Sequence, residues 1–364
     1  MYEPDKGLRA SLADRGVSRR DFLKFCSVMA ATLALPASFA PRIAKALEAA
    51  KRPPLVWLEM QDCAGCTESF LRAYNPTVAQ IVLDILSVNY HETIMSPSGA
   101  AAEKSLADTV AEGGYLTVVE GSIPTKDDGL YCCIGGRTAL DILNEVGSKS
   151  AAVITVGACA FYGGWPSTPP NPTGATGVQE VLSGVPIINL PGCPPNADNM
   201  TATVVYYLTF GKLPEVDSNS RPLFAYGHRI HDNCERRAHF DAGEFVKAWG
   251  DDGHRQGWCL YQMGCKGPVA YQNCPTIRWN QGTSWPVGAG HGCIACAGLK
   301  FWERAAYQPV DVQELQLTPP TTYPQAQAAT GASPVTTGVV GAAVGVAAGI
   351  AGAVAVRKLT EEKS

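Results

Sequence analysis

Residues 55–66 read Leu-Val-Trp-Leu-Glu-Met-Gln-Asp-Cys-Ala-Gly-Cys, a short apolar run that leads directly into a CxxC motif. The apolar part of this stretch has the length and composition of a buried strand. Similar strand-like runs follow, and segments with helical spacing lie between them. The strand-like runs cover residues 87–91, 115–120, 151–156 and 185–190, and the helical segments cover residues 77–86, 100–111, 137–146 and 196–210. This alternation predicts an α/β fold of the flavodoxin-like type, a doubly wound parallel sheet with helices on both faces, over residues 53–220.

Cysteines follow three of the predicted strands at the point where each strand ends. Cys63 and Cys66 come after the first strand, Cys159 after the fourth and Cys193 after the fifth. Because ligands bind at the carboxyl ends of parallel strands, we expect the four thiols to share one site. Four thiolates are the ligand set of a cubane iron–sulfur cluster. A CxxC motif alone also occurs in zinc and redox sites, and buried structural cysteines are the other alternative.

Regular periodicity fades over residues 221–308, where potential metal ligands become dense. His231 and Cys234 are three residues apart, so both can face one site. The remaining candidates in this region are Cys259, Cys265, Cys274, Cys293 and Cys296. A region with so little predicted secondary structure needs something other than a large apolar core to hold it folded, and bound metal clusters supply that stability. His231 taken alone could equally be a polar residue with an ordinary hydrogen-bond partner.

The ligand count limits the clusters without fixing them. Cys26 lies in a predicted export signal, and the adjacent Cys132 and Cys133 are interpreted as packing or free thiols. Setting these three aside leaves ten of the 13 cysteines. Together with His231 they divide into sets of four, four and three, enough for two 4Fe–4S clusters and one 3Fe–4S cluster. Twelve cysteines without the histidine would also make three cubanes, so the count alone leaves both possibilities open.

The first 46 residues are predicted to be a twin-arginine signal peptide. Ser18, Arg19 and Arg20 precede a weakly apolar run, and small-residue exits follow at residues 38–40 and 44–46. The twin-arginine translocase is therefore an expected partner during export. An ordinary N-terminal amphipathic helix is the alternative. The translocase carries folded proteins, which fits inserted metal clusters better than disulfides made after export.

The other end of the chain predicts a membrane anchor. Residues 338–356 carry neither charge nor proline and would span about 28 Å as a helix. Arg357 and Lys358 follow at once, so residues 357–364 are expected to form a cytoplasmic tail, with the globular body on the outer face of the inner membrane. Residues 309–337 have a linker composition. A flexible Gly/Ala tail is the alternative to a spanning helix.

Composition separates the remaining function classes. The formal net charge is −4, and no block of Lys and Arg stands out in the middle of the chain. A nucleic-acid partner is therefore not expected. The 13 cysteines leave two classes, a disulfide-bonded secreted protein or a metal or iron–sulfur protein.

At its cysteine motifs the chain resembles the small subunits of nickel–iron hydrogenases, and the resemblance extends over nearly all of residues 1–358. The motifs that carry it are Cys63-Ala64-Gly65-Cys66-Thr67-Glu68-Ser69, Gly157-Ala158-Cys159, Gly192-Cys193-Pro194-Pro195, residues 229–237 around His231-Asp232-Asn233-Cys234, Gly264-Cys265-Lys266-Gly267-Pro268, and Gly292-Cys293-Ile294-Ala295-Cys296. Ala64 departs from the threonine that is common in the family.

The resemblance implies a ligand set for each cluster. It implies a proximal 4Fe–4S cluster on Cys63, Cys66, Cys159 and Cys193, a distal 4Fe–4S cluster on His231, Cys234, Cys259 and Cys265, and a medial 3Fe–4S cluster on Cys274, Cys293 and Cys296. Pro286 resembles the proline that stands in place of a fourth medial ligand. Oxygen-tolerant members carry two extra cysteines at positions that match Gly65 and Gly164, so an ordinary proximal cluster and air-sensitive H2 oxidation are implied here.

The resemblance also implies a function. The nickel–iron centre lies in a separate large subunit, and this chain relays electrons from H2 oxidation towards a membrane cytochrome b or another quinone-linked membrane subunit. The alternative is the iron–sulfur subunit of a non-hydrogenase membrane redox complex, since the first domain is shared with such subunits.

Overall fold

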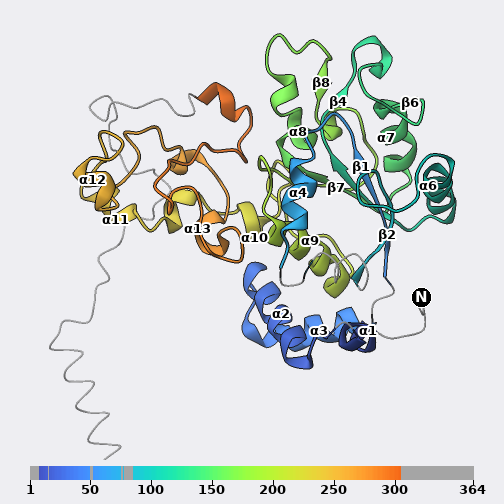
Figure 1. The fold of residues 1–364 in the computed structure, drawn as a ribbon, viewed down its shortest axis with the longest axis horizontal. Coiled ribbons are helices and arrows are strands. Elements are labelled where there is room, and N and C mark those ends of the chain that lie inside the picture. Colours follow the sequence, from blue (N-terminus) through green and yellow to red (C-terminus); the bar gives the residue numbers. More distant parts are fainter. Residues whose placement is uncertain (1–7, 15, 50–51, 75–76, 78–84, 305–364) are drawn as a thin grey trace, which may run out of the picture. The chain divides into compact units, whose positions relative to one another are not determined.

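The computed structural model describes residues 8–14, 16–49, 52–74, 77 and 85–304 (Figure 1). Most of the predicted helix over residues 77–86 lies outside these residues, as do the predicted linker, membrane helix and cytoplasmic tail. Among the described helices, none is both long and apolar enough to cross a membrane.

Five parallel strands form the central sheet. They are β1 (Pro54–Glu59), β2 (Ser87–His91), β3 (Leu116–Glu120), β7 (Ala152–Val156) and β9 (Ile187–Leu190). Their order in the sheet is β2-β1-β3-β7-β9, with Leu55 paired to Leu116 and Leu116 paired to Ala152. Counted along the chain this is the order 2-1-3-4-5 of flavodoxin-like sheets. The predicted α/β fold is therefore confirmed, with strand bounds within two residues of those expected.

Helices cover both faces of this sheet. The long ones are α6 (Ala100–Glu112), α7 (Ala139–Ser148) and α9 (Ala197–Phe210). In β1, Val56 and Leu58 belong to the core shared with α6 and α7, whereas Leu55 and Trp57 belong to the core shared with α9. Alternate side chains of a strand point to opposite faces, so a fully apolar strand needs cover on both sides.

Three helices precede the sheet and pack on its α9 side. They are α1 (Leu8–Asp14), α2 (Arg19–Thr32) and α3 (Ala40–Ala49), with the short 3-10 helix η1 (Ala37–Phe39) between the last two. Ser18 caps α2 by accepting a hydrogen bond from the backbone N–H of Asp21. Buried residues of all three helices belong to the same core as α9.

Short elements surround the sheet. They are α4 (Gly65–Leu71), α8 (Gly157–Tyr162), the antiparallel pair β4 (Ile123–Pro124) and β8 (Ala175–Thr176), the antiparallel pair β5 (Cys133–Ile134) and β6 (Arg137–Thr138), and the 3-10 helices η3 (Lys126–Gly129), η4 (Trp165–Ser167) and η5 (Val178–Glu180). Both α4 and α8 begin within six residues of the end of a sheet strand.

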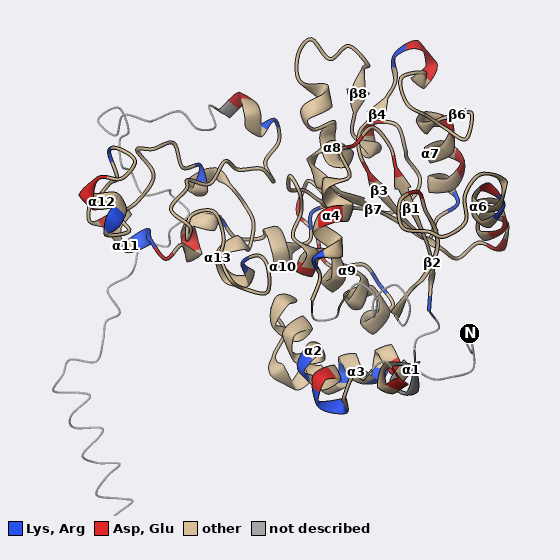
Figure 2. Cartoon of the chain, in the orientation of Figure 1, with Lys and Arg blue, Asp and Glu red and all other residues tan. Residues whose placement is uncertain are grey.

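After residue 220 the chain forms only single turns of helix within the described residues, as the fading periodicity predicted. These are α10 (Leu223–Tyr226), η6 (Ile230–Asn233), α11 (Arg237–Asp241), α12 (Asp252–Arg255), η7 (Gly267–Val269), α13 (Cys274–Ile277) and η8 (Phe301–Arg304). A separate small core contains buried residues of η6 and α13 and includes Cys265, Cys274 and Cys293, whereas Ala225 and Tyr226 of α10 belong to the core on the α9 side of the sheet. Over the described elements, Lys and Arg are scattered among acidic residues (Figure 2).

Candidate metal centres

The first site lies at the carboxyl edge of the sheet, between α4, α8 and the loop after β9. The thiols of Cys63, Cys159 and Cys193 are close enough to Cys66 to act on it electrostatically. Burial first, then the charges of Glu120 and of these three thiols, raise the pKa of the Cys66 thiol. The four cysteines that follow three separate strands are therefore brought together at one edge, as the sequence predicted.

Glycines make room for these sulfurs. A Cβ added at Gly157 would lie 2.5 Å from the Sγ of Cys66, and one at Gly164 would lie 2.5 Å from the Sγ of Cys159. Gly164 has a φ of +52°, a backbone conformation that other residues adopt only with strain. A Cβ added at Gly65 would lie 3.1 Å from the Sγ of Cys63. The ligand segments thus form a cradle that side chains at these glycines would fill.

Glu120, at the end of β3, fixes the α4 segment of this cradle. Its carboxylate accepts hydrogen bonds from the backbone N–H of Cys66 at 2.8 Å and of Thr67 at 2.9 Å. The Thr67 hydroxyl at 2.6 Å and the Trp57 indole at 3.3 Å also donate to it. Four donors on one buried carboxylate orient the first turn of α4, and with it Cys66. Glu120 was not predicted from the sequence, although a charged residue at the end of an apolar strand could have signalled it.

Other acidic side chains gather behind the cradle. One ligand atom each from Glu59, His91 and Glu92 lies within 4.8 Å of the others, and so do atoms of Glu59, Asp62 and Glu120. Burial raises the pKa of Glu92 to about 8 and lowers the pKa of His91 to about 4. The protonated carboxyl and the neutral imidazole are therefore favoured near neutral pH, which reduces the charge within this buried cluster.

Trp165, which was also not predicted from the sequence, contacts the same site. The indole N–H of Trp165 hydrogen-bonds the thiol of Cys193, and its backbone N–H hydrogen-bonds that of Cys159. Its ring stacks on Trp302 with a centroid distance of 5.6 Å and meets Phe301 edge-on at 5.3 Å. Aromatic rings from η4 and η8 thus cover this part of the first site.

The second site is made by Cys274, Cys293 and Cys296. Burial raises the pKa of each of these thiols, and the charges of Cys265, Cys296 and Cys274 add to this effect at Cys293. The Sγ of Cys293 accepts a hydrogen bond of 3.3 Å from the backbone N–H of Ala295. The indole of Trp279 donates to Cys274. Pro286, the predicted stand-in for a fourth ligand, is exposed between buried Trp285 and Val287.

The third site surrounds a small cavity lined by His231, Cys234, Cys259 and Cys265. The backbone N–H of Arg236 donates to the Sγ of Cys234 at 3.4 Å. Burial first, then the charge of Arg237, lower the pKa of His231 to about 4. The imidazole is therefore neutral at physiological pH, the form that can bind iron.

Hydrogen bonds connect the three sites in series. The backbone N–H of Cys193, in the first site, donates to the thiol of Cys296 in the second. The backbone N–H of Cys293, in the second site, donates to the Sγ of Cys265 in the third at 3.2 Å. The order along this chain of contacts is therefore first, second, third.

The spacing of the thiols argues against single metal ions. Tetrahedral zinc holds its sulfurs about 3.8 Å apart, as follows from a Zn–S bond of roughly 2.3 Å. All 13 cysteines lie in the described part of the chain, and no three of their thiols are within 4.8 Å of one another. None of the 13 is paired in a disulfide. Wider sets of thiols, with histidine in the third, suit the corners of iron–sulfur clusters.

The cysteines set aside from ligation lie elsewhere. Cys26 is fully buried in α2, and Cys132 packs partly buried against the core under α6 and α7. Cys133 is exposed. These positions agree with packing or free thiols.

Comparison with known proteins matches both halves of the chain. Residues 63–207 match the family described as NADH ubiquinone oxidoreductase, 20 Kd subunit, and residues 226–308 match the family of the C-terminal part of NiFe/NiFeSe hydrogenase small subunits. The chain is 48% identical over 301 residues to the periplasmic [NiFe] hydrogenase small subunit 1 of Nitratidesulfovibrio vulgaris, covering 82% of this chain and 95% of that protein. It belongs to the family of nickel–iron hydrogenase small subunits.

Other hydrogenase small subunits agree. The uptake hydrogenase small subunit of Azotobacter vinelandii is 47% identical over 80% of this chain and 82% of its own length. The hydrogenase-2 small chain of Escherichia coli (strain K12) is 44% identical over 90% and 88%. The [NiFeSe] hydrogenase structure from Desulfovibrio vulgaris Hildenborough superimposes with a TM-score of 0.68 at 33% identity, covering 72% of this chain and 99% of that one.

Membership decides between the function classes left open by the sequence. The match to residues 63–207 alone would also fit a subunit of another redox complex. The match to residues 226–308 and the relatives that span both regions are specific to hydrogenase small subunits. The chain is therefore the iron–sulfur electron-transfer subunit of a nickel–iron hydrogenase, which functions with a large subunit.

Proposed function

We propose that this chain takes electrons from H2 oxidation in the large subunit and relays them through three clusters to a membrane cytochrome b or another quinone-linked subunit. The proximal 4Fe–4S cluster would be held by Cys63, Cys66, Cys159 and Cys193, the medial 3Fe–4S cluster by Cys274, Cys293 and Cys296, and the distal 4Fe–4S cluster by His231, Cys234, Cys259 and Cys265. Bound iron–sulfur clusters supply one-electron acceptor and donor chemistry at each site.

One observation carries this proposal: the three sites are joined by two hydrogen bonds between ligand residues. Cys193 donates to Cys296, and Cys293 donates to Cys265 at 3.2 Å. Such contacts keep neighbouring sites close, as electron transfer between them requires. A set of unrelated structural metal sites would need no such linkage.

Residues of this subunit have three roles in the proposed relay. Thiols and the neutral imidazole of His231 bind iron, while glycines such as Gly164 leave room for the sulfurs. Donors aimed at sulfur, the indoles of Trp165 and Trp279 among them, stabilise negative charge on the ligands. A neutral histidine in place of an anionic thiolate raises the potential of the distal site, which suits the exit of electrons.

We propose a periplasmic location for the globular body. The relatives include a protein named periplasmic and one named an uptake hydrogenase, which agrees with the twin-arginine signal over residues 1–46. In this proposal residues 338–356 cross the inner membrane as a helix, the linker over residues 309–337 joins it to the body, and residues 357–364 remain in the cytoplasm.

Spectroscopy tests the cluster assignment. The oxidised holoenzyme should show one three-iron signal, because the medial site has three thiols. The Pro286→Cys variant should convert this cluster into a cubane and remove the signal, whereas the matched Pro286→Ala variant should keep it. An unchanged three-iron signal in Pro286→Cys would refute the placement of the medial site.

Export is tested separately. The double variant Arg19→Lys, Arg20→Lys should leave the subunit in the cytoplasm together with its large partner, because the translocase reads the arginine pair. Normal appearance of the double variant in the periplasmic fraction would show that residues 1–46 are not this kind of signal.

A further inference from the structure

The predicted export signal is folded onto the body of the subunit. Phe22, Phe25, Cys26 and Met29, on one side of α2, are buried in the core that also contains α9. The arginine pair, residues 19–20, is exposed. The apolar side of the signal is thus covered while its recognition motif faces solvent.

The second half of the signal is held by an aromatic contact. The rings of Phe39 and Phe210, at the end of α9, lie 6.2 Å apart. The guanidinium of Arg42 lies 5.6 Å from the centroid of Phe39 and 5.1 Å from that of Phe210. Ile43 and Leu47 of α3 are buried in the core that α3 shares with α9. Apolar burial together with cation–π contacts makes this a specific seat on α9.

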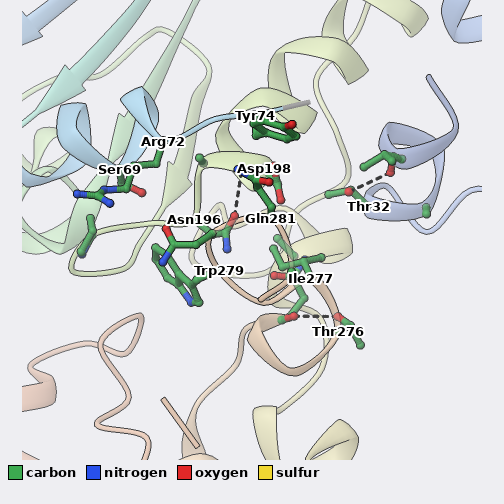
Figure 3. Close-up of a pocket in the computed structure, with 18 of the residues that line it drawn as sticks. Thr32, Ser69, Arg72, Tyr74, Asn196, Asp198, Thr276, Ile277, Trp279 and Gln281 are labelled. Atoms are coloured by element: carbon green, nitrogen blue, oxygen red, sulfur yellow. Dashed lines mark hydrogen bonds between the residues drawn. The ribbon is translucent and has the colours of Figure 1, made fainter. Parts of the chain in front are cut away.

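The end of α2 also walls a cavity of about 860 Å³ beside the proximal ligands. Figure 3 labels Thr32 of α2 on one side of this cavity and Ser69 and Arg72 from the α4 segment on the other. Gly65, which stands between Cys63 and Cys66, is part of the same lining. Cys63 itself is exposed. A partner that delivers electrons to a cluster held by these cysteines can approach at this face.

We propose that residues 8–49 form a removable cover over α9 and this cavity, and that the large subunit displaces the cover when it docks beside the proximal cysteines. The inference rests on the proposed export signal and on the proposed proximal site. Release is needed for export, because an apolar face buried on α9 cannot enter the translocation machinery at the same time.

The positions of the candidate cleavage sites also require the cover to be released. The two candidate cleavage sites lie at residues 38–40 and 44–46, within η1 and α3, and Ala40 and Ala44 are buried. Proteases cut segments that are exposed and locally unfolded, so cleavage also requires α3 to leave its seat.

Cys26 reports on the cover directly. It is fully buried, and burial raises the pKa of its thiol to about 12, so alkylation needs release of α2. We expect Cys26 in the free, cluster-loaded full-length subunit to react roughly a hundredfold more slowly than in a peptide of residues 1–49. Mass spectrometry of the Cys26 peptide separates this thiol from the other twelve. Equal rates in subunit and peptide would overturn the cover.

Adding the large subunit tests the displacement. In the complex the alkylation rate of Cys26 should rise to near that of the peptide. Protection that persists in the complex would overturn displacement by the partner.

A variant on the body leaves the signal sequence intact. Phe210→Ala should raise the alkylation rate of Cys26 in the free subunit by roughly tenfold, because the seat for Phe39 and Arg42 is lost. The matched control is Tyr131→Ala, which removes an exposed aromatic ring with its own cation–π contact to Lys126. An equal effect of both variants would contradict a specific seat on α9. Failure of the arginine variant above would remove the export role and leave these labelling results unchanged, so the two outcomes are distinguishable.

Discussion

The sheet region and the region after residue 220 hold their thiols by different means. In the first, Cys63, Cys159 and Cys193 sit on the rim of a sheet whose two apolar cores are complete without them. In the second, Cys265 and Cys293 are themselves part of the core, and the described helices around them are single turns. The first region is a stable scaffold that positions its ligands, whereas the folding of the second region depends on the metal clusters that its ligands bind.

Removal of iron should separate the two regions most strongly. With the clusters removed anaerobically by a chelator, amides over residues 221–304 should exchange with deuterium at nearly unfolded rates, because binding of metal supplies much of their folding free energy. Amides of β1, β3 and β7 should stay protected by their own cores. Hydrogen exchange detected by mass spectrometry measures the protection of both regions. Equal loss of protection in the two regions would contradict this difference.

Alanine at a glycine beside a ligand should be tolerated in one region only. Gly164→Ala places a Cβ 2.5 Å from the Sγ of Cys159 at a φ of +52°, whereas Gly267→Ala places one 3.5 Å from the Sγ of Cys265, an ordinary contact. We expect a cost of about 2 kcal/mol for Gly164→Ala and under about 0.5 kcal/mol for Gly267→Ala. Thermal unfolding measures the stability of both variants, and iron content measures how fully their clusters load. A proximal site that loads normally in Gly164→Ala would contradict the close approach of Gly164 to Cys159.

The buried carboxylates behind the proximal site should give the sheet region a dependence on pH. Burial raises the pKa of Glu92 from 4.5 to about 8. The folded state therefore binds this proton more tightly than the unfolded state. The contribution of protonated Glu92 to the free energy of unfolding is fully present below pH 4.5 and is lost as the pH rises towards 8. Glu92→Gln, which keeps an acceptor for the Glu59 amide, should remove this slope and stabilise the β1 amides by about 1.5 kcal/mol at about pH 8.5. Hydrogen exchange of the β1 amides at about pH 6 and pH 8.5 measures this pH dependence in the wild type and the variant. An unaltered pH dependence in the variant would assign the titration to another group.

The smallest effect expected is on reduction potentials. An indole N–H stabilises negative charge on a ligand sulfur, so its loss lowers the potential of that cluster. Trp165→Phe should lower only the proximal potential and Trp279→Phe only the medial one, each by roughly 40 mV for about 1 kcal/mol of hydrogen bond. Redox titration followed by electron paramagnetic resonance measures both. A shift at the wrong cluster, or none, would show that these indoles do not tune the sites they touch.

The strands and the cysteines behind them were predictable because their signals are local. A buried parallel strand is a short apolar run, and a ligand that follows it must lie at the carboxyl edge. The helix over residues 196–210 was predictable for the same reason, since its periodicity lies within one segment. Trp165 and Trp279 gave no such signal, because each acts on a cysteine at least five residues away in the chain. Glu120 stands out locally only as a charged residue at the end of an apolar strand, and its partner Cys66 lies 54 residues away.

The sequence by itself determined the sheet, the rim cysteines and the dense set of ligands after residue 220, because each depends on residue type and short spacing. Only the tertiary structure decided which ligands meet, that Cys193 touches Cys296 and Cys293 touches Cys265, and that α2 packs on α9 over the face of the proximal site. These contacts join segments tens to hundreds of residues apart. Their geometry is set by packing of the whole chain, and no local pattern encodes it.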